Sequence, residues 1–164
     1  MYRVAILTIS DKGSQGLRED KSGPEIARIV KEHGYEVVHT EIIPDERNQI
    51  AEAMKNLADE ERCELLLTTG GTGFARRDVT PEATLDIAEK RVPGISEAMR
   101  AYSNTITPRG MLSRGESVIR NKTLIINLPG SVKAVRENLE YVIEHLDHGL
   151  GILTGAEGEC GNGQ

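Results

Sequence analysis

The chain alternates between short apolar segments that are typical of buried strands and amphipathic segments that are typical of helices. Residues 3–10 (RVAILTIS) and 35–43 predict two strands, and a helical spacing of apolar residues separates them between Ser22 and Gly34. The continuous apolar run of residues 63–69 predicts a central parallel strand that is covered on both faces. Strands that alternate with helices form a mostly parallel sheet with helices on both faces, so the sequence predicts this α/β architecture.

The second half of the chain continues the same alternation. We expect helices from Thr80, from Pro93 to Thr105 and from Ser131. Two strands are expected between Ser117 and Asn127, joined by a turn near residues 121–122.

A single domain is expected over residues 1–154. The chain has 164 residues, which suits one hydrophobic core, and it shows no internal repeat and no linker. The last ten residues, 155–164, contain four glycines and no apolar periodicity, so we expect a mobile tail there.

The expected helices begin with residues that commonly cap helices. Ser22 followed by Glu25 has the spacing of a capping box, and Asp45, Thr80 and Ser131 are natural N-cap residues. Each of these residues therefore predicts a helix start at its own position.

The net charge of −6 conceals a basic middle segment. Between Gly70 and Lys133 there are 10 basic and 6 acidic residues, whereas the rest of the chain has 10 basic and 20 acidic residues. This balance argues against a general nucleic-acid binder, which is basic overall or along a clear stripe. It leaves room for a site for a small anion, and chance clustering of surface charge explains the same pattern about equally well.

Other classes of protein are excluded by what the sequence lacks. No apolar run approaches the roughly 20 residues that span a bilayer, and residues 1–4 lead directly into the first strand without a signal-peptide pattern. Cys63 and Cys160 form neither a CxxC motif nor a Cys/His cluster, which argues against a disulfide framework or a zinc site. We therefore expect a cytoplasmic protein with no membrane or nucleic-acid partner.

Four loops follow the predicted parallel strands. They comprise residues 10–13, 44–45, 70–78 and 127–131. Because ligands of such folds bind at the carboxyl ends of the strands, we expect these loops to meet at one edge of the sheet.

The strongest motif is the segment Thr68 to Thr84 (TTGGTGFARRDVTPEAT). Three glycines within four positions let backbone N–H groups approach a phosphate closely, although a tight turn alone would explain them about equally well. The segment lacks the Gly-Lys-Ser/Thr of a Walker loop and the last glycine of the dinucleotide fingerprint. Arg76, Arg77 and Asp78 then place two cations beside a carboxylate, which suits a phosphate site with a divalent metal.

Three further positions bear on chemistry. The spacing of Asp45 favours a helix cap over a metal ligand. Ser113 and Arg114 could hold a second phosphate in their loop. Lys133 lies near the expected start of the last helix, where the helix dipole disfavours a cation, and an anion bound at the free N–H groups there would offset this effect. The four histidines form no catalytic arrangement in sequence, so helix-surface roles are favoured for them.

Together these motifs resemble the molybdenum-cofactor biosynthesis domain of the MogA/MoaB type, the molybdopterin adenylyltransferases, to which the G domain of gephyrin is related. The resemblance rests on the glycine-rich motif, the Ser10-Asp11 turn, residues 43–45 (IPD), residues 107–114 (TPRGMLSR) and residues 124–131 (LIINLPGS). It covers nearly the whole chain to about Gly151.

The resemblance implies transfer of AMP from ATP to the terminal phosphate of molybdopterin, with release of pyrophosphate and a requirement for Mg²⁺. It implies a three-layer α/β/α sandwich in a trimer or hexamer, with other proteins of the same biosynthesis as further partners. Asp45 and Asp78 are the implied catalytic pair and the implied Mg²⁺ ligands. The implied nucleotide-binding residues are Ser10, Asp11, Pro44, Gly70, Gly71, Thr72 and Gly73. The implied molybdopterin-binding residues are Ser103, Ser113, Arg114, Asn127, Pro129, Gly130 and Ser131.

Other functions compete with the adenylyltransferase. The first is a non-catalytic molybdopterin-binding paralogue of the MoaB type, which the presence of both aspartates disfavours. The second is the later insertion of molybdenum, whose proteins carry additional domains that 164 residues cannot hold. The third is a mononucleotide or pyrophosphate hydrolase, which the implied molybdopterin-binding residues Ser113 and Arg114 weakly disfavour.

Overall fold

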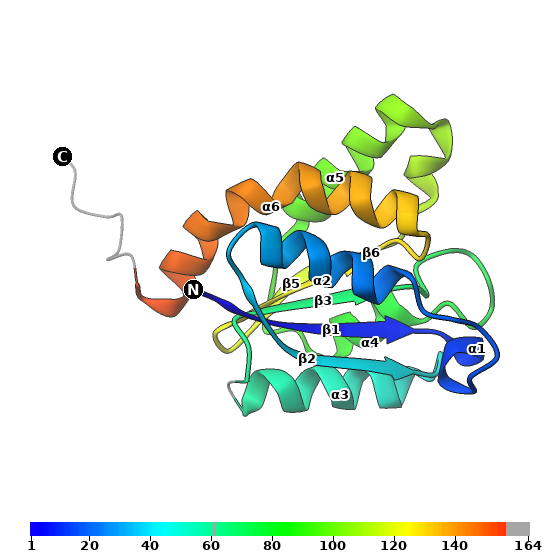
Figure 1. The fold of residues 1–164 in the computed structure, drawn as a ribbon, viewed down its shortest axis with the longest axis horizontal. Coiled ribbons are helices and arrows are strands. Elements are labelled where there is room, and N and C mark those ends of the chain that lie inside the picture. The colour runs from blue at the N-terminus through cyan, green and yellow to red at the C-terminus, as the bar shows by residue number, and fades with distance from the viewer. Residues whose placement is uncertain (61, 157–164) are drawn as a thin grey trace.

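A mixed sheet runs through the middle of the protein in the computed structural model, which describes residues 1–60 and 62–156 (Figure 1). Its strands are β1 (Arg3–Ile9), β2 (Glu36–Ile43), β3 (Leu65–Thr69), β4 (Lys90–Arg91), β5 (Ser117–Arg120) and β6 (Thr123–Leu128). The strand order is β2-β1-β3-β6-β5-β4, in which β2, β1, β3 and β6 are parallel and the pairs β6·β5 and β5·β4 are antiparallel. The predicted mostly parallel sheet is confirmed.

Helices cover both faces of this sheet. They are α1 (Asp11–Ser14), α2 (Ser22–Glu32), α3 (Arg47–Asp59), α4 (Thr80–Ile87), α5 (Pro93–Ile106), the 3₁₀ helix η1 (Pro108–Leu112) and α6 (Val132–Thr154). Figure 1 shows α2, α5 and α6 on one side of the sheet and α3 on the other. No helix within residues 1–60 and 62–156 combines the length and the apolar character that a membrane span requires.

The alternation of side chains along β1 divides the interior into two cores. Val4 and Ile6 pack in one cluster with residues of α2 and α6, such as Ile26. Ala5 and Leu7 point to the opposite face and pack in a second cluster with residues of α3 and α4. Successive residues of a strand face opposite sides of a sheet, which is why one continuous apolar run serves both cores.

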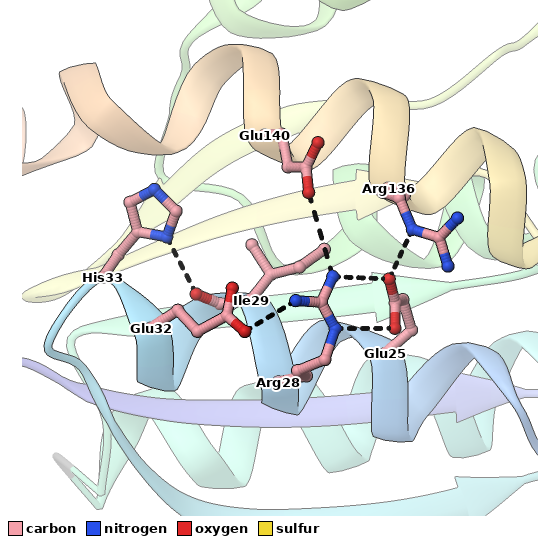
Figure 2. A network of polar contacts seen from close by, with 7 residues as sticks. All are labelled: Glu25, Arg28, Ile29, Glu32, His33, Arg136 and Glu140. Carbon is pink, nitrogen blue, oxygen red and sulfur yellow. Dashed lines mark hydrogen bonds and ion pairs between the residues drawn. The ribbon is translucent and has the colours of Figure 1, made fainter.

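An ion-pair network joins α2 to α6, which lie on the same side of the sheet (Figure 2). Arg28 donates to Glu25 at 2.8 Å and to Glu32 at 2.7 Å, and Arg136 of α6 donates to Glu25 at 2.7 Å. Glu140 of α6 lies 3.8 Å from the Arg28 guanidinium. The hydrogen bonds from Arg28 and Arg136 lower the pKa of Glu25 to about 2.

Helix capping follows the sequence prediction at one site and departs from it at others. Ser131 caps α6, because its hydroxyl accepts the N–H of Ala134 at 3.2 Å. The predicted capping box at Ser22 is wrong: Ser22 is itself helical and donates its hydroxyl to the carbonyl of Gly130 at 2.8 Å. Asp20 takes the capping role and accepts the N–H of Gly23 at 3.0 Å.

Two further expectations concern the start of α4 and the end of the chain. Thr80 is the first residue of α4 rather than its cap, and its hydroxyl donates to the carbonyl of Gly70 at 2.9 Å. This bond ties the start of α4 to the glycine-rich loop. A mobile tail was predicted for residues 155–164, of which the last eight lie outside the described part of the chain. Gly155 follows the last residue of α6 and has a φ of 77°.

Candidate active site

The loops after β1, β2, β3 and β6 meet at one edge of the sheet, as the parallel pairing requires. They surround a cavity of about 670 Å³, called here the large cavity. Predicted site residues among its lining are Ser10, Asp45, Gly70, Gly71, Asp78, Gly130 and Ser131. This volume lies in the range of roughly 300–1,000 Å³ that is usual for small-molecule sites.

Gly70 and Gly71 allow the glycine-rich loop to pass close to the neighbouring loops. Their φ angles are 96° and 69°, in the region that favours glycine. A Cβ atom at Gly70 would lie 2.4 Å from the carbonyl oxygen of Ile9, and one at Gly71 would lie 2.3 Å from Oγ1 of Thr80. Larger residues at these positions would push the loop away from Ile9 at the end of β1 and from Thr80 at the start of α4.

Asp45 faces the large cavity and does not cap α3. Its backbone N–H donates to Oδ1 of Asp11 at 3.0 Å, and its Oδ2 accepts the N–H of Asp11 at 2.8 Å. Glu46 occupies the N-cap of α3, and its side chain makes no capping hydrogen bond to the helix, so the predicted cap at Asp45 is wrong. The reciprocal bonds hold the loops after β1 and β2 together and leave Oδ1 of Asp45 without a hydrogen bond among the described residues.

Asp78 brings a second carboxylate to the same cavity. Its Oδ2 accepts the N–H of Ala75 at 2.9 Å, within the turn that the glycine-rich loop makes. Burial raises the pKa of Asp45, and the charges of Asp11 and Asp78 raise it further. A cation in this cavity would therefore offset a real electrostatic cost.

The two carboxylates fit a Mg²⁺ ion that is shared with phosphates. Mg²⁺ prefers oxygen ligands and is usually bound by one or two carboxylates together with substrate phosphates and water. Asp45 and Asp78 each keep one oxygen that no described residue engages. Within the described ranges no group of three His, Cys, Asp or Glu side chains could hold a metal, so the remaining ligands would have to come from substrate and solvent.

Arg77 ties three of these loops together. Its Nε donates to Oδ2 of Asp11 at 2.6 Å, and its Nη2 donates to Oε1 of Glu46 at 2.6 Å. The hydrogen bond from Arg77 lowers the pKa of Asp11. Because Asp11 in turn holds the backbone of Asp45, Arg77 stabilises the position of the carboxylate pair indirectly.

A second cavity of about 220 Å³, called here the small cavity, lies between α5, η1 and α6. Ser103, Ser113, Asn127 and Pro129 line it, which are four of the seven predicted molybdopterin-binding residues. Pro129 faces the small cavity, whereas the next two residues of the same turn face the large one. The two cavities thus flank a single turn.

Asn127 is held on three sides by the protein. Its Oδ1 accepts the N–H of Glu116 at 3.0 Å, and its Nδ2 donates to the hydroxyls of Thr68 and Thr84, each at 3.0 Å. The side chain is almost fully buried. It therefore fixes the end of β6 beside the small cavity, whatever further contact it makes with a ligand.

The remaining predicted residues line neither cavity. These are Asp11, Pro44, Thr72, Gly73 and Arg114. The carbonyls of Thr72 and Gly73 accept hydrogen bonds from the backbone N–H and from Nε of Arg114, at 2.9 and 2.8 Å. Arg114 therefore supports the glycine-rich loop at Thr72 and Gly73.

Sequence reasoning missed the segment between α1 and α2, which forms another wall of the large cavity. Arg18, Asp20 and Lys21 line the cavity there, and Asp20 also accepts the hydroxyl of Thr8 at 2.7 Å. The available signal was an aspartate three residues before Gly23, which has the spacing of an N-cap. The competing serine at position 22 obscured it.

The chain is similar to known proteins over most of its length. Residues 5–148 match the family model described as probable molybdopterin binding domain. A molybdopterin adenylyltransferase of Helicobacter pylori (strain J99) is 42% identical over 154 residues, which cover 93% of this chain and 88% of the relative. Its counterpart of Escherichia coli (strain K12) is 44% identical over 143 residues, which cover 85% of this chain and 73% of the relative.

Solved structures agree with these sequence matches. The crystal structure of the molybdopterin biosynthesis enzyme MoaB from Thermus thermophilus superposes with a TM-score of 0.90 at 46% identity. The match covers 94% of this chain and 98% of that one.

Proposed function

Because the chain belongs to the family of probable molybdopterin binding domains, we propose that it is a molybdopterin adenylyltransferase of molybdenum cofactor biosynthesis. The relatives that carry this name are 42% to 44% identical over most of the chain. Its substrates are ATP and molybdopterin.

The reaction joins two anionic substrates. An oxygen of the terminal phosphate of molybdopterin attacks the α-phosphorus of ATP, and a new P–O bond forms. The bond from the α-phosphorus to the oxygen that bridges it to the β-phosphate breaks, and pyrophosphate leaves with the bonding electrons. The products are adenylylated molybdopterin and pyrophosphate.

The observation that carries this proposal is the pair of cavities on either side of the turn at Pro129. The large cavity has the volume and the glycine-rich wall that suit a nucleotide with its phosphates. The small cavity, at about 220 Å³, lies below the usual range for a whole ligand and suits part of molybdopterin. A terminal phosphate that extends from the small cavity across Gly130 would reach the carboxylates of the large one.

Electrostatics and alignment, rather than a general base, are the catalytic demands here. The attacking phosphate is already an anion, so no proton has to be removed from a nucleophile. Asp45 and Asp78 would hold Mg²⁺, which when bound supplies positive charge between the reacting phosphates. The backbone N–H of Gly71 would orient the nucleotide phosphates, whereas that of Gly70 donates to the carbonyl of Leu128 at 3.4 Å, and Ser10 would lie on the nucleotide side.

We further propose that the protein forms a homo-oligomer, a trimer or a hexamer, and acts in the cytoplasm. An apolar groove of about 450 Å³ between α5 and α6 supports the assembly, since Val92, Ile95, Ala98 and Tyr141 line it. Exposed apolar grooves of this kind mark interaction sites, and the cores of subunit interfaces are similarly apolar. Light scattering would measure the assembly, and Ile95→Glu should shift it to monomers.

The alternative is a non-catalytic molybdopterin-binding protein. The carboxylate pair favours the enzyme, because two aspartates beside a phosphate site would only add repulsion unless a cation lies between them.

Turnover of aspartate variants tests the proposal. The purified protein is mixed with molybdopterin, ATP and Mg²⁺, and adenylylated molybdopterin is measured. Asp78→Asn should lower kcat on the order of 100-fold, in the range seen when one transition-state contact is removed. Asp86→Asn is the matched control, because Asp86 pairs with Arg47 on an exposed surface and should leave the rate unchanged. Equal rates for Asp78→Asn and the parent protein would refute the assignment of the carboxylates.

A further inference from the structure

The guanidinium of Arg114 is fully engaged by the protein. Its Nε donates to the carbonyl of Gly73 and its Nη2 to the carbonyl of Asp78, each at 2.8 Å. Its Nη1 pairs with Glu82 at 2.5 Å. Arg114 lies outside the lining of both cavities, so it supports the glycine-rich loop instead of facing a ligand.

Arg100 has the opposite surroundings. It is half-buried on α5 and lines the small cavity, one helical turn before Ser103. Within the described residues only its Nη1 has hydrogen-bond partners, and it donates to the carbonyls of Gly115 at 2.8 Å and Ser113 at 3.4 Å. Its Nε and Nη2 have no partner among the described residues, and no carboxylate there forms an ion pair with it.

Arg109 adds a second cation to the same cavity. It belongs to η1, its side chain is exposed, and its guanidinium makes no ion pair with any residue that the structure describes. The cost of a partly desolvated cation without a counter-ion falls on the half-buried Arg100, and an anionic ligand beside it removes that cost. Glu137 also lines the small cavity, but it pairs with Lys133 at 3.7 Å, so the two arginines favour a ligand that carries negative charge.

We propose that Arg100 binds an anionic group of molybdopterin in the small cavity, assisted by Arg109, while Arg114 is a positioning residue for the glycine-rich loop. The proposal rests on the proposed function, since it takes molybdopterin as the ligand. Because the terminal phosphate of molybdopterin would extend to the large cavity, the ene-dithiolate is the anionic group that would stay in the small cavity beside Arg100. A guanidinium donates two parallel hydrogen bonds to such groups, and Nε with Nη2 is the free edge of Arg100.

Equilibrium binding tests this assignment without turnover. Molybdopterin is separated into bound and free fractions and quantified by fluorescence after oxidation. Arg100→Met should weaken molybdopterin binding about 10-fold or more, as expected for the loss of a charge-assisted hydrogen bond, and should leave ATP binding unchanged. Arg100→Lys keeps the charge and should recover part of the loss. Arg114→Met should lower the melting temperature and weaken ATP binding more than molybdopterin binding.

Arg62→Gln is the matched control, because it removes one exposed arginine that precedes the amino end of β3, away from both cavities. A second comparison uses a sulfur-free phosphorylated pterin and its dephosphorylated form. If Arg100→Met weakens binding of the phosphorylated form only, Arg100 binds the phosphate instead of the ene-dithiolate, which would contradict the placement of the phosphate in the large cavity. If Arg100→Met and the parent protein have the same affinity for each sulfur-free form but different affinities for molybdopterin, Arg100 binds the ene-dithiolate.

Two results would overturn the inference. One is unchanged molybdopterin affinity in Arg100→Met, and the other is an equal loss for molybdopterin and ATP. Either result leaves adenylyl transfer by the parent protein intact, so it counts against Arg100 alone. Conversely, a parent protein that binds molybdopterin through Arg100 without forming product would refute the proposed function and support this inference.

Discussion

Replacing Gly70 with alanine should destabilise the protein and distort the large cavity at the same time. Gly70 has a φ of 96°, and a Cβ there would lie 2.4 Å from the carbonyl oxygen of Ile9. Ile9 ends β1 and precedes Ser10, whose backbone N–H donates to the carbonyl of Ile43 at 2.9 Å. The clash is with backbone, so rotation of a side chain cannot relieve it.

The expected cost has two parts. A left-handed backbone costs a residue with a Cβ about 1–2 kcal/mol, from which the lost freedom of the unfolded chain removes about 0.4–1 kcal/mol. A relaxed carbon–oxygen contact is about 3.3–3.6 Å, so the Ile9 carbonyl must move by about 1 Å, and overpacking of this kind costs about 1–3 kcal/mol. The sum is a destabilisation of about 1–5 kcal/mol, or roughly 2–18 °C in melting temperature for a domain of this size.

Gly34→Ala separates the two parts. Gly34 has a similar φ of 83°, and a Cβ there would meet no atom within 4 Å. It should therefore lose only about 1 kcal/mol, which urea unfolding of both variants and the parent protein would measure. If Gly70→Ala proves no less stable than Gly34→Ala, the close packing of the glycine-rich loop against β1 is wrong.

Three further predictions concern single side chains. Asp45→Asn should abolish turnover yet fold at least as stably as the parent, because the raised pKa of Asp45 means that its charge opposes folding. In thermal melts, the gain in stability over the parent should grow as pH rises above the ordinary carboxylate range. A large loss of stability in Asp45→Asn would contradict this prediction. Glu25→Gln should cost about 1 kcal/mol at pH 7 by urea unfolding, because Arg28 and Arg136 are partly exposed. This loss should be full above the ordinary glutamate pKa and vanish as pH falls through about 2, so a loss that persists in acid would argue against the ion pairs. Asn127→Ala should cost about 2–4 kcal/mol, since it removes the hydrogen-bond partner of the Glu116 N–H and of the Thr68 hydroxyl. Thr84 loses the donor Asn127 but still donates its hydroxyl to the carbonyl of Thr80 at 2.8 Å. A melting temperature equal to that of the parent would exclude this role of Asn127.

The sheet could be predicted from the sequence because its signals are local. The apolar runs of residues 3–10 and 63–69 appear as β1 and β3 with nearly the expected bounds. The turn at residues 121–122 also lies where expected, and Asn121 adopts a φ of 50°. Short elements such as β4 were missed, because two exposed residues, Lys90 and Arg91, carry no hydrophobic pattern.

Helix caps were harder to predict because their polar groups have distant partners. Ser22 binds the carbonyl of Gly130, Thr80 binds that of Gly70, and Asp45 binds the backbone of Asp11. Each side chain is a good capping residue by propensity, yet the fold offers it a tertiary partner. Sequence spacing alone does not encode which partner is available.

The same limit applied to the arginines of the candidate site. The basic segment between Gly70 and Lys133 is evident from the sequence, but the sequence does not tell which of its cations are neutralised inside the protein. Arg114 is held by Glu82 and by two carbonyls, and Arg120 is held by Asp59. Arg100 keeps free donors in a cavity, and this distinction required the structure.

The stoichiometry of the products tests the central claim most directly. Pyrophosphate and adenylylated molybdopterin are measured together after the protein is mixed with Mg²⁺ and each substrate alone or both. We predict equal amounts of the two products when ATP and molybdopterin are both present, and no pyrophosphate from ATP alone. Pyrophosphate release without molybdopterin would indicate a hydrolase, and molybdopterin binding without either product would contradict adenylyl transfer across the turn at Pro129.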